Sequence, residues 1–223
     1  MKLVVENRIY AGVCLFVAII GMGPELRNNR QKPSKAARQT QVASNSHRES
    51  HPKHGHTTAQ PSRMRVPIDW HKSSETVPYP DLATTKDFWV KVSLKKNRTY
   101  LYDGKKLLYT MYSTGGMYKR NPQTGEIESM TPTGTYYAQA ERGDSFFNSS
   151  LNEGANYYVS WLNHGEYLFH SVPTKADGSY NLREAAKLGK STGSHGCIRL
   201  SVPDAKWMEQ NLPEGTKVVI ADN

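Results

Sequence analysis

The residues around Cys197 have the types and spacing of a site for nucleophilic chemistry. The local sequence is Ser-Thr-Gly-Ser-His-Gly-Cys-Ile-Arg-Leu, residues 191–200. Its small residues leave the cysteine open to a substrate and let backbone N–H groups approach the sulfur. His195 and Arg199 each lie two positions from Cys197, so in an extended segment they would share its face and favour the thiolate. Because the thiolate is the nucleophilic form of cysteine, the pattern predicts a reactive thiol.

A thiol nucleophile needs a base, and residues 81–223 contain three histidines: His164, His170 and His195. His170 ends a predicted strand, so it could meet Cys197 from a second strand end and form a Cys–His pair. The alternative for His170 is a hydrogen-bonded, partly buried imidazole without a catalytic role. His164 stands next to Gly165 and is predicted to be a surface residue of a turn. A metal site would have to use Cys197, His195 and His170 with no other obvious ligand, and none is predicted.

The elements that must position these residues are mostly strands. Apolar and polar residues alternate over 88–94, as in a half-buried strand, and Asp103-Gly104 is a typical hairpin turn between strands 99–102 and 107–112. Further strands are predicted at 135–139, 157–162, 166–171 and 216–220. A short helix is predicted over 181–188. A second helix begins after Ser201 and ends near Asn211, with Pro203 in its first turn and Asp204 as a capping-box acid. These elements predict a mainly β domain.

Composition and charge narrow the class of protein. The chain has 223 residues, 37% hydrophobic content and a mean hydropathy of −0.68, which excludes a multi-span membrane protein. Two cysteines, Cys14 and Cys197, are too few for a disulfide-stapled miniprotein. An apolar run at 9–23 follows basic residues, so residues 1–23 are predicted to be a signal peptide or a short membrane anchor. Cys14 lies in that run, so Cys197 is expected to have no disulfide partner.

Residues 24–80 are predicted to be a basic, disordered linker. They contain 10 Lys and Arg against 4 Asp and Glu, and they have almost no large apolar residue before Met64. Such a stretch cannot bury enough surface to offset the entropy of ordering it. Its charge suits anionic cell-wall polymers or a membrane surface. Nucleic acid is not expected as a partner, because the tract has no interleaved aromatic residues and follows an export segment. The histidine-rich run 51–56 lacks the partners of a physiological metal site.

The third piece, 81–223, resembles the L,D-transpeptidase (YkuD-like) catalytic domain. The resemblance rests on Ser194-His195-Gly196-Cys197-Ile198-Arg199 with His170 upstream. Further matching elements follow in the expected order, namely 112–115, the Thr-Pro-Thr-Gly-Thr element at 131–135, 204–207 and 215–218. Together they cover about 88–220. One departure is the spacing, because the 23 residues 171–193 between His170 and Ser194 exceed the usual separation in the family. The surplus is expected to form a lid-like insertion beside the site.

The resemblance implies a β-sandwich-like mixed sheet with one or two short helices and an extracytoplasmic enzyme of the cell wall. Cys197 would attack the carbonyl of the third residue of a donor peptidoglycan stem and release the terminal D-Ala. A neighbouring stem amine would then take the acyl group, giving a 3→3 crosslink. No cofactor is implied, and carbapenems are expected to acylate the thiol.

The resemblance also implies roles for individual residues. His170 would be the general acid and base, the carbonyl of Ser171 would orient it, and His195 would assist. The oxyanion and substrate-binding set would comprise the N–H groups of Gly196 and Cys197, with Ser194, Arg199 and Tyr158. Arg199 could instead brace the loop. Groove positions are possible for Tyr157, Tyr158 and Trp161, although most aromatic residues at strand spacing belong to a core.

Two other functions fit the same residues. In the first, water takes the acyl group, which would make the protein an L,D-carboxypeptidase. In the second, the domain is a non-catalytic wall-binding module on a basic tether. The presence of Cys197, His170 and His195 together argues against the binding module, which has no use for that arrangement.

Overall fold

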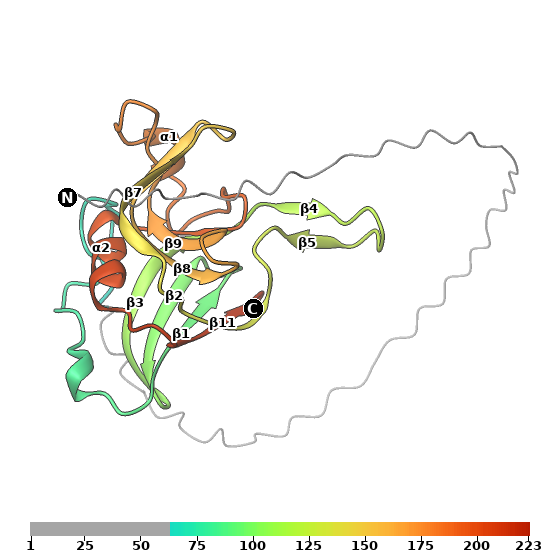
Figure 1. The fold of residues 1–223 in the computed structure, drawn as a ribbon. Helices are drawn as coiled ribbons and strands as arrows, with labels where there is room; N and C mark the ends of the chain where they lie inside the picture. The colour runs from blue at the N-terminus through green and yellow to red at the C-terminus, as the bar shows by residue number, and fades with distance from the viewer. Residues whose placement is uncertain (1–62) are drawn as a thin grey trace, which may run out of the picture. The chain divides into compact units, whose positions relative to one another are not determined.

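A computed structural model describes residues 63–223, and the predicted export segment 1–23, Cys14 and the histidine-rich run all lie outside this range. The described part is built on one nine-stranded mixed sheet with the strand order β6-β11-β1-β2-β3-β10-β9-β8-β7 (Figure 1). The strands are β1 Phe88–Ser93, β2 Arg98–Asp103, β3 Lys106–Thr114, β6 Gly134–Tyr137, β7 Arg142–Asn148, β8 Glu153–Leu162, β9 Tyr167–Ser171, β10 Ile198–Leu200 and β11 Lys217–Ala221. The mainly β fold predicted from the sequence is confirmed.

The sheet combines antiparallel hairpins with two parallel pairs. β1, β2 and β3 are antiparallel neighbours, and the predicted hairpin turns at Asp103-Gly104, where Gly104 has φ +54°. β11 pairs in parallel with β1, and β10 pairs in parallel with β9. The short β10 is thus held between β3 and β9 in the middle of the sheet, where both of its edges are paired.

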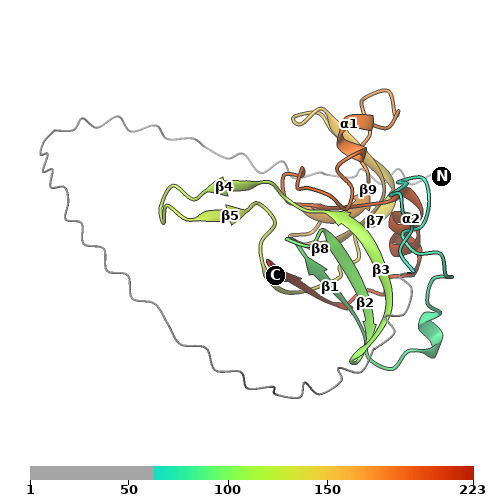
Figure 2. The same cartoon turned by 180° about the vertical axis from the view of Figure 1, so that it is seen from behind.

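The sheet curls around a core formed by one face of its strands. Val90 and Val92 of β1 are buried while Lys91 between them is half-buried, which is the period-two pattern expected of a strand with one wet face. Helix α2, Val202–Asn211, lies along the curled sheet (Figures 1 and 2) and contributes Ala205 and Met208 to this core. Each fully buried large apolar side chain stabilises the fold by about 1.5–3 kcal/mol.

Helix α2 begins as predicted but uses its acid differently. Ser201 is the N-cap, its side chain accepts a hydrogen bond from the Asp204 N–H, and a proline occupies the first turn. The Asp204 carboxylate, predicted to complete a capping box, instead accepts hydrogen bonds from Ser74 and from the Tyr79 hydroxyl. Asp204 is fully buried, and burial raises the pKa of its carboxyl.

The linker predicted over 24–80 is wrong at its C-terminal end, because residues 63–80 belong to the folded part. Ser74 and Glu75 are each 2% exposed, and Glu75 accepts a hydrogen bond from the backbone of Thr110 in β3. Tyr79 packs against the main core. Met64, Ile68 and Trp70 pack against the cluster around Tyr112, and Val77 joins Tyr79 at the main core. The segment is therefore attached by apolar packing as well as by buried hydrogen bonds to distant residues.

Two segments branch from the sheet near β10. The 171–193 stretch contains α1, Leu182–Ala185, a single turn capped by Asn181 and shorter than the helix predicted over 181–188. A hairpin of β4, Tyr118–Arg120, and β5, Ile127–Ser129, projects away from the sheet (Figures 1 and 2); it was not predicted. Within residues 63–223, the structure has no helix of the length and apolarity that crossing a membrane requires.

The buried carboxylate of Asp204 predicts a measurable role for Tyr79. Replacing Tyr79 with Phe removes one donor to this carboxylate, so the free energy of unfolding should fall by about 1–2 kcal/mol. Tyr102→Phe is the matched control, because its half-buried ring has no hydroxyl hydrogen bond within residues 63–223. Urea unfolding of both variants checks this. Equal losses in the two would contradict the role assigned to the buried carboxylate.

Candidate active site

The thiol of Cys197 lies just before β10, where the chain enters the centre of the sheet. Its side chain is partly exposed, and its sulfur contacts the carbonyl oxygen of Glu166 at 3.6 Å. Cys197 is the one free cysteine in the part of the chain that the structure describes. Burial of the sulfur raises the pKa of the thiol to about 11, although the nearby Arg199 opposes this shift. The resting sulfur is therefore a protonated thiol at neutral pH.

His170 lies on β9 and is 3% exposed. Its Nδ1 is 2.7 Å from the carbonyl oxygen of Ser171, which is the orienting contact that the family resemblance implies. Because a carbonyl can only accept, Nδ1 carries the hydrogen and Nε2 keeps a free lone pair. Burial, together with the nearby Arg199 cation, lowers the pKa of the imidazole to about 3. His170 is therefore a neutral base.

The pairing of β10 with β9 places these two groups on one face of the sheet. Ile198 is opposite Phe169 and Arg199 is opposite His170 in the parallel register. Ile198 and Phe169 both point into the core, so the residues that alternate with them project to the other face. Cys197 and His170 therefore share that face as diagonal neighbours on adjacent strands. Within residues 63–223 no hydrogen bond joins the thiol to the imidazole, and each is held by a backbone carbonyl instead.

The loop before Cys197 is fixed by hydroxyl groups. Ser194 is 2% exposed; its Oγ accepts the Gly196 N–H at 3.1 Å and donates to the Cys197 carbonyl at 2.6 Å. Ser194 therefore braces the loop. The predicted role of Ser194 in binding substrate does not fit this position. The Gly196 N–H, predicted to be an oxyanion donor, is occupied by the same contact. Thr131 was missed as a site residue: its hydroxyl donates to the Gly196 carbonyl at 2.8 Å.

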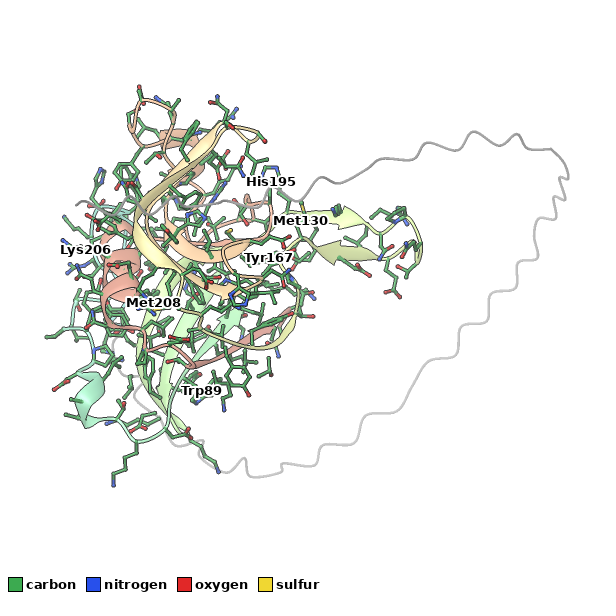
Figure 3. The ribbon with its side chains drawn as sticks, viewed as in Figure 1. Trp89, Met130, Tyr167, His195, Lys206 and Met208 are labelled. Atoms are coloured by element: carbon green, nitrogen blue, oxygen red, sulfur yellow. The ribbon has the colours of Figure 1, made fainter. Side chains whose placement is uncertain are left out.

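Gly196 also explains why the predicted alternation fails at His195, whereas Cys197 and Arg199, on either side of Ile198, do share one face. Its φ of +142° interrupts the extended backbone, and a side chain at this position would meet the Tyr167 ring at 2.6 Å and the Met130 carbonyl oxygen at 3.1 Å. His195 is exposed near Met130 and Tyr167 (Figure 3), and its ring makes no hydrogen bond or ion pair in the described chain. Arg199 is buried. The three side chains therefore have different surroundings.

Arg199 braces the site, which decides between its two predicted roles. It is 1% exposed, its Nη2 bonds both carboxylate oxygens of Glu153 at 2.7 and 2.8 Å, and its Nη1 bonds Glu184 at 2.8 Å. These contacts join β10 to the start of β8 and to α1. Glu153 and Glu184 were missed, because nothing in the local sequence links them to Arg199. The predicted insertion is thus attached to the catalytic strand by a buried ion pair.

The aromatic residues predicted to line a groove have different positions. Trp161 is 1% exposed and packs in the core, but it also lines a groove beside the turn between β8 and β9, as predicted. Tyr157 is partly buried against the same core. Tyr158 is half-buried, and its ring meets Phe146 edge-on at 5.6 Å. Phe146, another missed residue, meets His170 edge-on at 5.5 Å. Phe146 is therefore the direct apolar neighbour of the His170 imidazole, and Tyr158 is separated from that imidazole by the Phe146 ring.

His164 lies in a surface turn, as predicted. It is exposed between β8 and β9, and its Nδ1 lies 2.7 Å from Glu141. Across residues 63–223, no three His, Cys, Asp or Glu side chains converge in a way that could hold a metal ion.

Comparisons with known proteins agree with the sequence resemblance. The family profile described as "YkuD: L,D-transpeptidase catalytic domain" matches residues 87–220. The Bacillus subtilis (strain 168) protein named "Putative L,D-transpeptidase YciB" is 46% identical over 157 residues, which are 70% of this chain and 76% of that protein.

Similar solved structures include a fused Zn-dependent amidase/peptidase/peptidoglycan-binding protein from Clostridium acetobutylicum, at 31% identity and TM-score 0.43, covering 61% of this chain and 52% of that one. An L,D-transpeptidase from Mycobacterium smegmatis has 18% identity and TM-score 0.45, covering 60% and 58%. The chain thus spans little more than half the length of these two structures.

The raised pKa of the thiol predicts how Cys197 should react with pH. Since only the thiolate is alkylated, the rate with iodoacetamide should rise about tenfold per pH unit from pH 7 to pH 10 without levelling off. The measurement uses the full chain with Cys14→Ser and peptide mapping of the Cys197 adduct. A plateau already reached below pH 9, or fast alkylation at pH 6, would show a thiolate–imidazolium pair and contradict the neutral resting state.

The buried ion pair predicts a large stability effect at Arg199. Arg199→Leu leaves Glu153 without its partner and Glu184 with Lys187 as its remaining close ion-pair partner, so the free energy of unfolding should fall by about 3–5 kcal/mol. Arg183→Leu is the control, because the Arg183 side chain is 86% exposed and its contact with Glu184 is long, at 3.8 Å. Denaturant unfolding would separate the two; a loss below 1 kcal/mol at Arg199 would refute the bracing role.

Proposed function

Since the chain belongs to the L,D-transpeptidase (YkuD) family, we propose that it is a cysteine acyltransferase that forms 3→3 crosslinks between peptidoglycan stem peptides. The observation that carries the proposal is a partly exposed thiol and a neutral, buried imidazole on the same face of two adjacent strands. A protonated nucleophile and an unprotonated base are the states that general-base catalysis of thiol attack requires.

In the first half-reaction the Cys197 sulfur attacks the carbonyl carbon of the third residue of a donor tetrapeptide stem. Nε2 of His170 takes the thiol proton as the carbon–sulfur bond forms. The peptide C–N bond then breaks, and the imidazolium returns the proton to the leaving D-Ala amine. The product is a thioester on Cys197. The Cys197 N–H is the remaining oxyanion donor at the loop, because Ser194 occupies the Gly196 N–H.

In the second half-reaction an amine of an acceptor stem attacks the thioester carbonyl. His170 takes a proton from the attacking amine and delivers it to the departing sulfur, so a C–N bond replaces the C–S bond and the thiol is restored. His195, exposed beside Cys197, contributes charge or orientation to the substrate. The reaction needs no cofactor. By family resemblance, carbapenems are substrates for the same acylation.

The hydrolytic alternative, an L,D-carboxypeptidase, shares the first half-reaction and differs only in the acceptor. A wall-binding module without catalysis would need neither the thiol nor the base. We further propose that residues 1–23 export the chain and either are removed or anchor it. The basic residues that follow would then hold the domain against anionic cell-wall polymers or the membrane surface.

Intact mass spectrometry of the full chain with a tetrapeptide-stem muropeptide tests the proposal. The expected adduct has the mass of the stem minus D-Ala. In a Cys14→Ser background, which leaves Cys197 as the one thiol of the chain, it should be absent in Cys197→Ala. A crosslinked product on addition of an acceptor stem identifies transfer, and a free tripeptide stem identifies hydrolysis. If the chain is folded and its thiol is free, but no D-Ala is released from the donor stem, the enzyme proposal is refuted. Wall binding retained by Cys197→Ala would then favour the binding module.

A further inference from the structure

A groove of about 480 Å³ lies next to the turn between β8 and β9 and takes no part in the mechanism above. Residues 135–141 form one wall, and Trp161, Leu162, His164, Glu214 and Gly215 form the rest. This volume is in the range of sites that bind small ligands or short peptide segments.

The groove adjoins the nucleophile through two elements. The first is the 163–166 turn, in which His164 lines the groove and Glu166 contacts the Cys197 thiol through its carbonyl oxygen. The second is the Tyr167 ring. It packs against Trp161, at 5.4 Å between ring centroids, and lies directly against Gly196. A ligand in the groove would therefore be one turn and one ring away from the thioester.

The groove contains an open strand edge. β6 is the terminal strand of the sheet and pairs with β11; beyond its end, Gln139 and Glu141 bond Ser160 of β8, so the free edge is confined to residues 135–137. Ala138 exchanges hydrogen bonds with Gly215 and Thr216, so by the antiparallel alternation the N–H and C=O groups of Thr135 and Tyr137 face away from β11. Such an edge can bind the amide groups of an extended peptide.

Two polar atoms at the groove lack partners. Trp161 is 1% exposed, and its indole nitrogen makes no hydrogen bond with any residue of 63–223. Oε2 of Glu141 is buried and also without a hydrogen bond there, while its Oε1 contacts His164. Buried polar atoms are seldom left unsatisfied, because each one costs about 1–3 kcal/mol. One N–H donor and one carboxylate acceptor are complementary to the amide or amine groups of a peptide.

The charge of the groove distinguishes the two substrates of a transpeptidase. Its lining contains Glu141 and Glu214 and no Lys or Arg. The 172–193 segment, attached beyond Arg199, contains four Lys and Arg against two Asp and Glu. Both stems carry a terminal carboxylate and a side-chain amine, but in the donor it is the carboxylate that adjoins the bond that breaks, whereas in the acceptor it is the amine that must approach the thioester. Glutamate side chains favour the amine and repel the carboxylate.

We propose that this groove is the binding site of the acceptor stem peptide, with the free edge of β6, the Trp161 indole N–H and the Glu141 carboxylate as its recognition groups. The assignment rests on the proposed transpeptidase function and specifies how its second substrate binds. The bound acceptor would extend from the groove past the Tyr167 ring, which brings its amine to the thioester carbonyl.

The two half-reactions can be measured separately on the full chain with Cys14→Ser. The thioester is formed with a tetrapeptide-stem donor whose own side-chain amine is acetylated, so that it cannot act as acceptor. A stem peptide with a free amine is then added, and loss of the acyl-enzyme and appearance of crosslinked product are followed by mass spectrometry. The variants are Glu141→Gln and Trp161→Phe. The control is Glu126→Gln, an exposed glutamate outside the groove.

For Glu141→Gln, the acceptor concentration that gives half-maximal discharge should rise about tenfold. The acylation rate constant should change by less than threefold. Trp161→Phe should act in the same direction, with its melting temperature measured to account for lost packing, and Glu126→Gln should change neither step. An unchanged acceptor dependence in Glu141→Gln would overturn the groove assignment, as would an equal loss in acylation.

The result for the wild-type chain distinguishes failure of the groove assignment from failure of the proposed transpeptidase function. A wild-type thioester that water discharges and added amine does not would overturn the acceptor groove and leave the thioester enzyme intact. A chain that forms no thioester at all would refute the proposed function and the groove assignment together.

Discussion

The site depends on a parallel pairing of only three residues, between β10 and β9. This pairing sets the register that puts Cys197 and His170 on one face of the sheet, and a shift by one residue would turn one of them into the core. So short a strand is weakly specified by its own backbone contacts. Its position is secured by Arg199, bonded to Glu153 and Glu184, and by Thr131, bonded to Gly196. The ion pairs are therefore part of the positioning of the thiol.

Burial decides the charge states of the reacting pair. A thiolate and an imidazolium would both have to be desolvated here, whereas a thiol and a neutral imidazole cost little to bury. The Arg199 cation, itself neutralised by two carboxylates, adds to the effect on His170 by disfavouring a second positive charge. In the mechanism proposed above, the proton then moves only when a substrate carbonyl is in place to receive the sulfur, which protects the thiol between turnovers.

The sequence predicts what depends on local order and misses what depends on distant contacts. The alternation of β1, the hairpin at Gly104 and the Ser201 cap are readable because each involves neighbours in the chain. The attachment of residues 63–80 was missed because the contacts that hold them are long-range: Ser74 and Tyr79 reach Asp204, some 130 residues away, and other residues of the segment pack on distant clusters. The partners of Arg199 were missed for the same reason. The misplaced His195 has a different cause, since Gly196 breaks the strand geometry that the prediction assumed.

An enzyme that transfers an acyl group between two substrates must select the acceptor amine over water and over a second donor. The thiol itself cannot make this selection. The discrimination must come from the surfaces on either side of it. In this chain those surfaces differ. The groove beyond Tyr167 is acidic and has an open strand edge, and the 172–193 segment carries a net positive charge and is attached by a buried ion pair. An acceptor bound in the groove would extend its amine past Tyr167 to the thioester and so occupy the approach that water would otherwise use. The balance between transfer and hydrolysis is thereby linked to how well the acidic groove is filled.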